Sequence, residues 1–488
     1  MTTQYGKSEY YGKLSGKITT DDWDILVSYT REKLNHLLDK TWGSKPLLQN
    51  VKFTSKPYIP GVDLTEDYNF ALSSPVLNFG NLDGNPRAFL KMGFSGSVTS
   101  TVKPNPPVTT PIPADVYFLQ IGVPLASFSA EEDKFYLNIL LETDINCLAG
   151  KDVVEFKSSE EAEHHIVFHF HNEDATTWDF TADTSKPHPL LENLLKAKGD
   201  VATWFGSRSH VAWVDYAVNK ISSKKDPTSV LLRPKSYKFV IAEETLCVFI
   251  QTEGSGNPQG NTQGTRFGRK YDHFDFSPIP KDYTGSIIVS RDVFFQKFIW
   301  KQIQSVLPGG VIEKTAAAGA KLELRPTGLL NSGGSAWIGQ WFCTLESSKI
   351  DCTDHPLTIE FFDEAPFDKP KYKWSWTFSG KFPFIENDKT IHITLSCEIP
   401  TKTKTLATVE GDTMKFTLAF ESADQPPTKS DIDISPIKAE INLPTFTVDL
   451  PELNFFSTQN IFAPGERFIQ VSDLMFPSDL VLCGNMPS

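Results

Sequence analysis

The chain has 488 residues, of which 40% are hydrophobic and 22% are charged, as in an ordinary folded globular protein. It holds 36 Phe but only 5 Met, and this bias favours sheets over helical bundles. Its net charge of −13 argues against nucleic acid as a partner.

No run of about 18 apolar residues occurs, so we expect no transmembrane segment. The N-terminus lacks the apolar stretch of a secretory signal. A cytoplasmic location is therefore the default expectation, and secretion by a non-classical route stays open.

A long amphipathic helix is predicted near the N-terminus. Thr19 or Thr20 can cap it, and the aspartates that follow suit the positive end of a helix dipole. About 22 residues would give a rod of roughly 33 Å. Apolar or small side chains recur at helical spacing and form one face of it: Trp23, Leu26, Val27, Thr30, Leu34, Leu37, Leu38 and Trp42.

Strands and turns are predicted in the next part of the chain. Asp83-Gly84 indicates a hairpin turn. Residues 101–113 hold too many prolines for a central strand, so an extended loop is expected there. The segment 230–251 predicts a hairpin that turns near Glu243-Glu244.

A second helix is predicted after Ser290, which is a good N-cap. Its apolar face holds Phe295, Ile299, Ile303 and Val306. Strands then follow to the C-terminus, and one of them alternates as Tyr372, Trp374, Trp376 and Phe378.

A weak internal repeat accompanies the two helices. Ile25–Ser28 lies in the first predicted helix, and the similar Ile288–Ser290 precedes the second. The tripeptide Phe-Ser-Gly follows each of them, at 94–96 and at 378–380. Two halves, each a long helix followed by many strands, are the simplest interpretation.

Catalytic motifs are missing from the sequence. It contains no phosphate-binding glycine loop, no nucleophile elbow and no HExxH. His169 and His171, with His165 nearby, could bind zinc in a metal-dependent hydrolase, but a solvated strand face explains them better. We predict no catalytic residues, no metal site and no cofactor.

The cysteines also indicate no chemistry. Asp351–His355 puts a thiol beside acidic and imidazole groups, and Pro356 favours a surface loop there. The six cysteines lack metal-binding spacing, and Cys247 and Cys397 fit small buried hydrophobic positions.

The excess of apolar side chains indicates a binding role. A broad apolar helix lying in the concavity of a twisted antiparallel sheet can leave an elongated apolar tube beside it. Each buried methylene contributes about 0.8 kcal/mol, so an acyl chain of about 16 carbons gains roughly 12 kcal/mol gross without a polar anchor. The candidate groove residues are Leu26, Leu34, Leu37, Phe295, Ile299, Ile303, Trp374 and Trp376.

Four segments resemble the tubular lipid-binding (TULIP) proteins of clostridial neurotoxin gene clusters, the P-forty-seven and OrfX proteins. They are Trp23-Asp24-Ile25, the stretch from Leu231 to Thr252, the stretch from Pro278 to Phe295, and the closing residues from Pro477 to Asn485. The resemblance implies helix-in-sheet tubes, lipid binding, a role as an accessory or complex-forming protein, and no catalytic residues.

The predicted fold class is therefore α+β and rich in strands, with two TULIP-like halves, each a long helix wrapped by a highly twisted antiparallel sheet. The halves are residues 1–280 and 281–488, and the C-terminal segment is allowed to pack back on the first half. The leading hypothesis is a non-enzymatic protein that binds a lipid or another apolar small molecule and serves as an accessory component of a toxin or protein complex. The alternative is a structural or protein-interaction module with the same fold and filled tubes.

Overall fold

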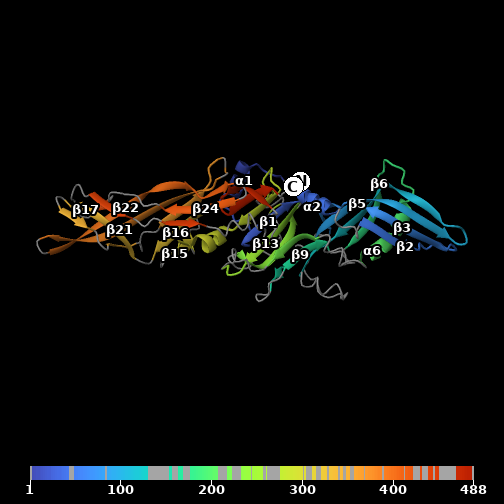
Figure 1. The fold of residues 1–488 in the computed structure, drawn as a ribbon, viewed down its shortest axis with the longest axis horizontal. Helices are drawn as coiled ribbons and strands as arrows, with labels where there is room; N and C mark the ends of the chain where they lie inside the picture. Colours follow the sequence, from blue (N-terminus) through green and yellow to red (C-terminus); the bar gives the residue numbers. More distant parts are fainter. Residues whose placement is uncertain are drawn as a thin grey trace.

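The computed structural model shows an elongated molecule made mainly of antiparallel sheets, with both termini near its middle (Figure 1). It describes residues 3–42, 49–82, 85–129, 153–156, 163–168, 176–206, 217–222, 232–242, 244–255, 260, 267, 275–300, 302–303, 310–314, 320–326, 329–338, 341–344, 348–351, 357–365, 367, 369–386, 389–410, 413–420, 429–430, 438–442, 446–449 and 469–485. No helix in these ranges is long and apolar enough to cross a bilayer.

A seven-stranded sheet forms the middle of the molecule and joins distant parts of the sequence. At its centre β1 and β14 pair antiparallel, with Ile25 opposite Val289. Its strands in spatial order are β28 (Gln470–Met475), β29 (Leu480–Asn485), β14 (Gly285–Val289), β1 (Ile25–Thr30), β13 (Thr245–Thr252), β12 (Pro234–Ala242) and β8 (Val154–Glu155).

This sheet has an approximate two-fold arrangement. The hairpin β12–β13 pairs with β1 on one side, and the hairpin β28–β29 pairs with β14 on the other. A helix follows each central strand: α2 (Arg31–Trp42) after β1, and α8 (Arg291–Val293) with the π-helix η2 (Phe294–Trp300) after β14. The strand-helix order therefore recurs, although the domain division at residues 280 and 281 stays a prediction.

A six-stranded sheet forms one end of the molecule, at the right of Figure 1. Helices α5 (Leu191–Lys196) and α6 (Lys198–Gly206) pack against it, and the Asn193 amide donates to buried Glu66 at 3.0 Å. Its strands are β2 (Asn50–Ser55), β3 (Leu64–Leu72), β4 (Val76–Leu82), β5 (Asn85–Val102), β6 (Val108–Val123) and β10 (Thr177–Ala182).

A ten-stranded sheet forms the opposite end. Its strands are β15 (Gly310–Lys314), β16 (Ala320–Pro326), β17 (Leu329–Ile338), β18 (Trp341–Thr344), β19 (Ser348–Asp351), β20 (Leu357–Phe362), β21 (Lys371–Glu386), β22 (Lys389–Thr405), β25 (Lys429–Ser430) and β26 (Lys438–Asn442). Two three-stranded sheets complete the fold: β7 (Leu125–Ser129), β9 (Glu163–Phe168) and β11 (Ala217–Ser222), and β23 (Ala407–Glu410), β24 (Thr413–Phe420) and β27 (Phe446–Asp449).

Both faces of the central sheet are buried. Ile25, Val27 and Tyr29 of β1 face one large apolar cluster that continues into both ends of the molecule. Leu26 faces a smaller cluster on the opposite side, which α1 (Lys7–Leu14) covers with Tyr10 and Leu14. Because both faces are covered, β1 has no exposed residue.

The predicted N-terminal helix is wrong over its first part. Asp21 and Asp22 have φ of 51° and 67°, which a helix start does not allow, and residues 25–30 form a strand. A strand buried on both faces is apolar at nearly every position, so it also satisfies helical spacing. The helix that follows spans 12 residues, and no long helix wrapped by a sheet is present in the described ranges.

The Pro-rich segment is also partly a strand rather than a loop. Residues 101–102 end β5, and residues 108–113 begin β6. Strand β10 pairs with β6 only from Tyr117 to Gly122, so Pro111 and Pro113 lie where β6 has no described partner on its other side. Prolines are tolerated at such an edge because no ladder bond is lost there.

Other predicted elements are confirmed. Strands β12 and β13 form the expected hairpin, and β4 pairs antiparallel with β5 up to Leu82 opposite Asn85. The two turn residues 83–84 lie outside the described residues. Ser290 caps the second helix, since its hydroxyl accepts from the Val293 amide at 3.3 Å. Tyr372 and Trp374 lie buried in β21 as expected.

Candidate functional site

The predicted groove residues whose side chains the structure describes lie in the buried core. Leu34, Phe295, Ile299, Ile303 and Trp374 belong to the large apolar cluster, and each is at most 8% exposed. Leu26 lies on the opposite face of the central sheet, with Trp23 and Phe249. The structure does not describe the side chains of Leu37 and Trp376.

Aromatic rings fill the interior where η2 meets the ten-stranded sheet. Phe294 lies 5.6 Å from Phe361 and 5.2 Å from Phe476, measured between ring centroids. Phe295 lies 5.4 Å from Phe361. Rings at these separations pack directly against one another, so this part of the interior is occupied by the protein's own side chains.

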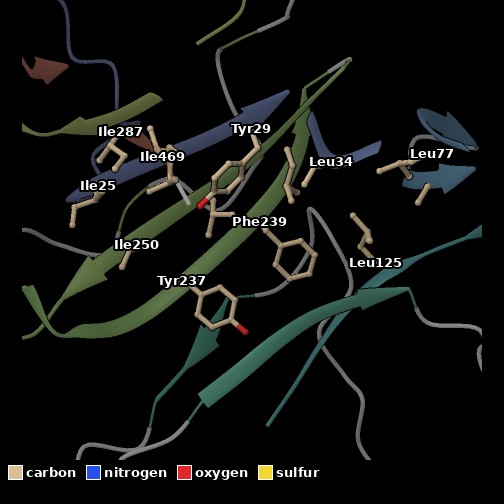
Figure 2. Close-up of a cluster of buried hydrophobic side chains, with 14 of the residues drawn as sticks. Ile25, Tyr29, Leu34, Leu77, Leu125, Tyr237, Phe239, Ile250, Ile287 and Ile469 are labelled. Atoms are coloured by element: carbon tan, nitrogen blue, oxygen red, sulfur yellow. The ribbon is translucent and has the colours of Figure 1, made fainter. Parts of the chain in front are cut away.

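Towards the six-stranded sheet, Figure 2 shows a similar convergence within the same large cluster. Tyr29 and Phe239 come from the central sheet, while Leu34, Leu77 and Leu125 come from α2, β4 and β7. All five belong to the same buried cluster. The interior therefore joins the central sheet to the base of the six-stranded sheet.

Two buried aspartates hold the central sheet to neighbouring segments. Asp24 accepts from the Thr252 amide at 2.7 Å and from its hydroxyl at 2.6 Å. The Lys297 ammonium donates to the same hydroxyl at 2.5 Å, and η2 is thereby attached to β13. Asp479 accepts from the amide and hydroxyl of Thr19 and from the Arg291 amide.

Burial raises the pKa of Asp479, and these hydrogen bonds oppose the rise. Thr19 thus binds Asp479 instead of capping a helix. Because backbone and hydroxyl groups surround both carboxylates, we assign them a structural role.

The described cysteine thiols are inert. Cys247 and Cys483 are fully buried and free, which confirms the expectation for Cys247. Burial raises the pKa of Cys247 to about 12, far above the range of a reactive thiolate.

The described residues also contain no group of three His, Cys, Asp or Glu that could hold a metal ion. His165 lies in β9, opposite Phe128 and Lys220. His169, His171 and Cys352–His355 lie outside the described residues, so the zinc hypothesis stays untested.

A surface groove of about 490 Å³ lies on the outer face of the six-stranded sheet. Apolar side chains form most of its wall, and Ser73, Ser95, Lys91 and Asp115 add polar groups. Its lining residues are Ala71, Leu72, Ser73, Val76, Lys91, Gly93, Phe94, Ser95, Ala114, Asp115 and Phe118.

An irregular pairing of β5 with β6 accompanies the groove. Phe94 lies opposite Tyr117 and Gly96 lies opposite Ile112, so residues 113–116 of β6 face only Ser95 of β5. Such a bulge bends the strand out of the ladder. Ala114 and Asp115 of the bulged segment form part of the groove wall.

Two glycines of β5 have different roles at this bulge. A Cβ on Gly96 would lie 2.2 Å from the Asn69 carbonyl oxygen, so only glycine allows β3 to approach there. A Cβ on Gly93 would meet Ser73 Oγ at 3.4 Å and Phe118 at 3.8 Å, which are ordinary contacts. Both neighbours line the groove, so a larger side chain at residue 93 would occupy it.

Hydrogen bonds fix the groove's serine side. The Ser73 amide donates to the Gly93 carbonyl at 2.7 Å, and the Gly93 amide donates to the Ser73 hydroxyl at 2.9 Å. On the opposite side, the Lys91 ammonium lies 4.1 Å from the centroid of the Phe118 ring. The groove therefore offers an apolar wall with one exposed cation, Lys91, and one exposed anion, Asp115, beside it.

Sequence reasoning missed this groove, although one signal was available. A glycine inside an alternating strand and prolines in its partner are typical of a bulge. From the sequence alone, Gly96 is part of a repeated tripeptide, and the prolines predict a loop.

Comparisons with known proteins give relatives in structure only. No family model matches the sequence, and no curated protein matches it. The structure of P47 from Clostridium botulinum A2 aligns with 96% of this chain and 98% of its own, with 11% identity and a TM-score of 0.47.

The crystal structure of P47 of Clostridium botulinum E1 aligns with 96% of this chain and 99% of its own, with 10% identity and a TM-score of 0.46. That of lipopolysaccharide binding protein aligns with 95% and 99%, with 9% identity and a TM-score of 0.27. P47 is among the proteins that the sequence segments resemble. These likenesses concern the overall fold and assign no ligand to this chain.

Proposed function

We propose that the protein is a non-enzymatic binding protein for a lipid or another amphipathic molecule, and that the groove on the six-stranded sheet is its site. The groove itself is the observation that carries the proposal. Its volume of about 490 Å³ falls in the range of small-molecule sites, roughly 300–1,000 Å³. Such sites combine an apolar wall with a few placed polar groups.

The groove chemistry fits a molecule with an apolar body and a polar end, because its wall holds both a cation, Lys91, and an anion, Asp115. Leu72, Val76 and Phe118 present apolar surface to the body. The Lys91 ammonium can pair with a carboxylate or phosphate at the rim, since its contact with Phe118 leaves it exposed. Within this proposal, a role as an accessory component of a protein complex follows from the resemblance to proteins of toxin gene clusters.

Titration with a fluorescent long-chain fatty acid tests the site. We expect the parent to bind it and the Gly93→Leu variant to bind roughly tenfold more weakly or worse, because the leucine fills the groove. Gly93→Ala is the matched control and should bind like the parent, with unfolding curves showing that each variant folds.

Val76→Asp provides a second test at an exposed position, where folding is not at risk. A negative charge there should also weaken binding of the anionic probe. Equal binding by the parent, Gly93→Leu and Val76→Asp would contradict the groove as the site. No binding by the parent, together with no lipid seen by native mass spectrometry after gentle extraction, would contradict the function.

A second candidate function is a structural or interaction module without a ligand. The filled interior around Phe294, Phe361 and Phe476 favours it, because the described rings leave the predicted tube occupied there.

A further inference from the structure

Exposed hydrophobic side chains gather at one place on the molecule. Among the described residues seven large ones are exposed, and four of them lie in or beside two loops. Tyr58, Ile59 and Val62 are in the β2–β3 loop, residues 56–63, and Val108 directly follows the β5–β6 loop, residues 103–107. We call residues 56–63 and 103–108 the tip. The other three exposed residues, Ile18, Val76 and Leu195, lie on separate elements.

The two loops of the tip lie side by side. Leu64 pairs with Val102 where the strands end. The Lys103 amide donates to the Asp63 carbonyl at 3.3 Å, and the Lys103 ammonium lies 3.1 Å from the Asp63 carboxylate.

The tip projects away from the rest of the molecule. Ala88 of β5 pairs with Val123, next to the base where Leu125 faces the central sheet (Figure 2). Val102 lies at the opposite end of β5, roughly 45 Å along an extended strand. The tip therefore lies at the far end of the six-stranded sheet, at the right of Figure 1.

A tight turn holds the apolar residues of the first loop outward. The Val62 amide donates to the Ile59 carbonyl at 3.1 Å, and Gly61 between them has φ of 76°. Proline followed by glycine at positive φ is typical of a type II turn, and Pro60-Gly61 fits it. The turn places Ile59 and Val62 next to each other, while Tyr58 is 91% exposed. These side chains are therefore presented to solvent by a defined backbone rather than by a loose loop.

The charge of the tip differs from that of the whole chain. Its only side chains charged at neutral pH are Lys56, Lys103 and Asp63, two cations and one anion, whereas the chain carries −13. The tip therefore carries a net charge of +1 and does not itself repel an anionic surface. Lysines beside tyrosine and aliphatic residues are the composition that proteins use at a membrane–water interface.

We propose that the tip docks the protein on a phospholipid bilayer, with Tyr58, Ile59, Val62 and Val108 entering the headgroup region. Four side chains on a projecting end present far less surface than the roughly 800 Å² per partner of a stable protein interface. They are sufficient for shallow penetration of a bilayer, which closes around a convex end. This docking does not depend on the groove, whose nearest residue on β5, Ser95, lies roughly 23 Å along the strand from Val102.

Flotation with vesicles of four parts phosphatidylcholine to one part phosphatidylserine tests the docking. We expect the parent to float with the vesicles and the double variant Tyr58→Ser/Ile59→Ser to show a partition coefficient about tenfold lower. Ile18→Ser is the matched control, because Ile18 is 42% exposed and Ile59 38%, and Ile18 lies near the N-terminus instead of the tip. The control should float like the parent.

The double variant Lys56→Glu/Lys103→Glu separates electrostatic attraction to the bilayer from insertion of the apolar side chains. It should weaken flotation about threefold with the anionic vesicles and have little effect with phosphatidylcholine alone. No flotation of the parent, or equal flotation of the parent and Tyr58→Ser/Ile59→Ser, would overturn the proposal. Fatty-acid binding by all tip variants should stay at the parent level, so failure of the docking is distinguishable from failure of the groove.

Discussion

The central sheet and the six-stranded sheet use the same antiparallel pairing but bury different numbers of faces. In β1 and β14 all residues but Thr30 are buried. In β3 buried Tyr68, Phe70 and Leu72 alternate with exposed Asn69 and Ala71. The first sheet therefore forms core on both sides, whereas the second has one face available for ligands.

This difference explains where the predicted groove and the observed groove lie. The predicted residues whose side chains are described lie in or against the two buried clusters that cover the central sheet. The observed groove lies on the outer face of the six-stranded sheet, where a bulge interrupts an otherwise regular surface. Apolar excess alone identifies core, and concavity arises where the ladder is irregular.

The largest expected loss of stability comes from removing a buried aromatic ring next to the central sheet. Phe294 is fully buried among Phe295, Phe361 and Phe476, so Phe294→Ala should lower the free energy of unfolding by about 3–5 kcal/mol. Urea denaturation measures this loss. Exposed Val76→Ala on the six-stranded sheet should cost less than about 0.5 kcal/mol, and similar losses for both would contradict the contrast between the sheets.

A second expected effect separates the two glycines of β5. Gly96→Ala should destabilise the protein by about 3 kcal/mol, since its Cβ would meet the backbone of β3. Gly93→Ala should stay within about 1 kcal/mol of the parent, because its Cβ makes only ordinary contacts. Thermal and urea unfolding compare the pair. An equal cost at both positions would argue against the bulge geometry.

A smaller, pH-dependent effect is expected at Asp479. Burial raises the pKa of Asp479 in the folded protein, so its protonation stabilises the folded state. This stabilisation is fully present below the ordinary aspartate pKa of about 3.9. It is lost as the pH rises through the raised pKa. A tenfold difference in proton affinity between folded and unfolded states is worth about 1.4 kcal/mol.

Asp479→Asn removes this titration. The variant's loss of stability relative to the parent should therefore be larger below pH 4 than at pH 7, as measured by urea denaturation at several pH values. A difference that does not change with pH would show that the carboxyl titrates alike in both states.

The smallest expected effect concerns an exposed ion pair on the six-stranded sheet. Lys103 and Asp63 are 77% and 62% exposed, so Lys103→Gln should change the free energy of unfolding by less than about 0.5 kcal/mol. Thermal unfolding at low and high salt checks this. A larger change would mean that the tip loops depend on the pair.

The sequence by itself determined the strand-rich class, the hairpin β12–β13, the Ser290 cap and the burial of Cys247. These features depend on neighbouring residues: alternation, turn residues, a capping hydroxyl and an apolar surrounding. It also indicated an internal repeat that relates Ile25–Ser28 to Ile288–Ser290. Ile25–Ser28 lies in β1 and Ile288-Val289 in the adjacent strand β14, while Ser290 caps the helix that follows.

Only the tertiary structure decided whether residues 25–30 form a strand or a helix, because a fully buried strand has no polar face to reveal its period. Pairing with β13 and β14, which lie more than 200 residues away in the sequence, made that choice. The groove and the tip were likewise decided by distant contacts: Gly96 beside Asn69, and Lys103 beside Asp63. Local patterns carry no information on such approaches, since strand pairing alone brings these residues together.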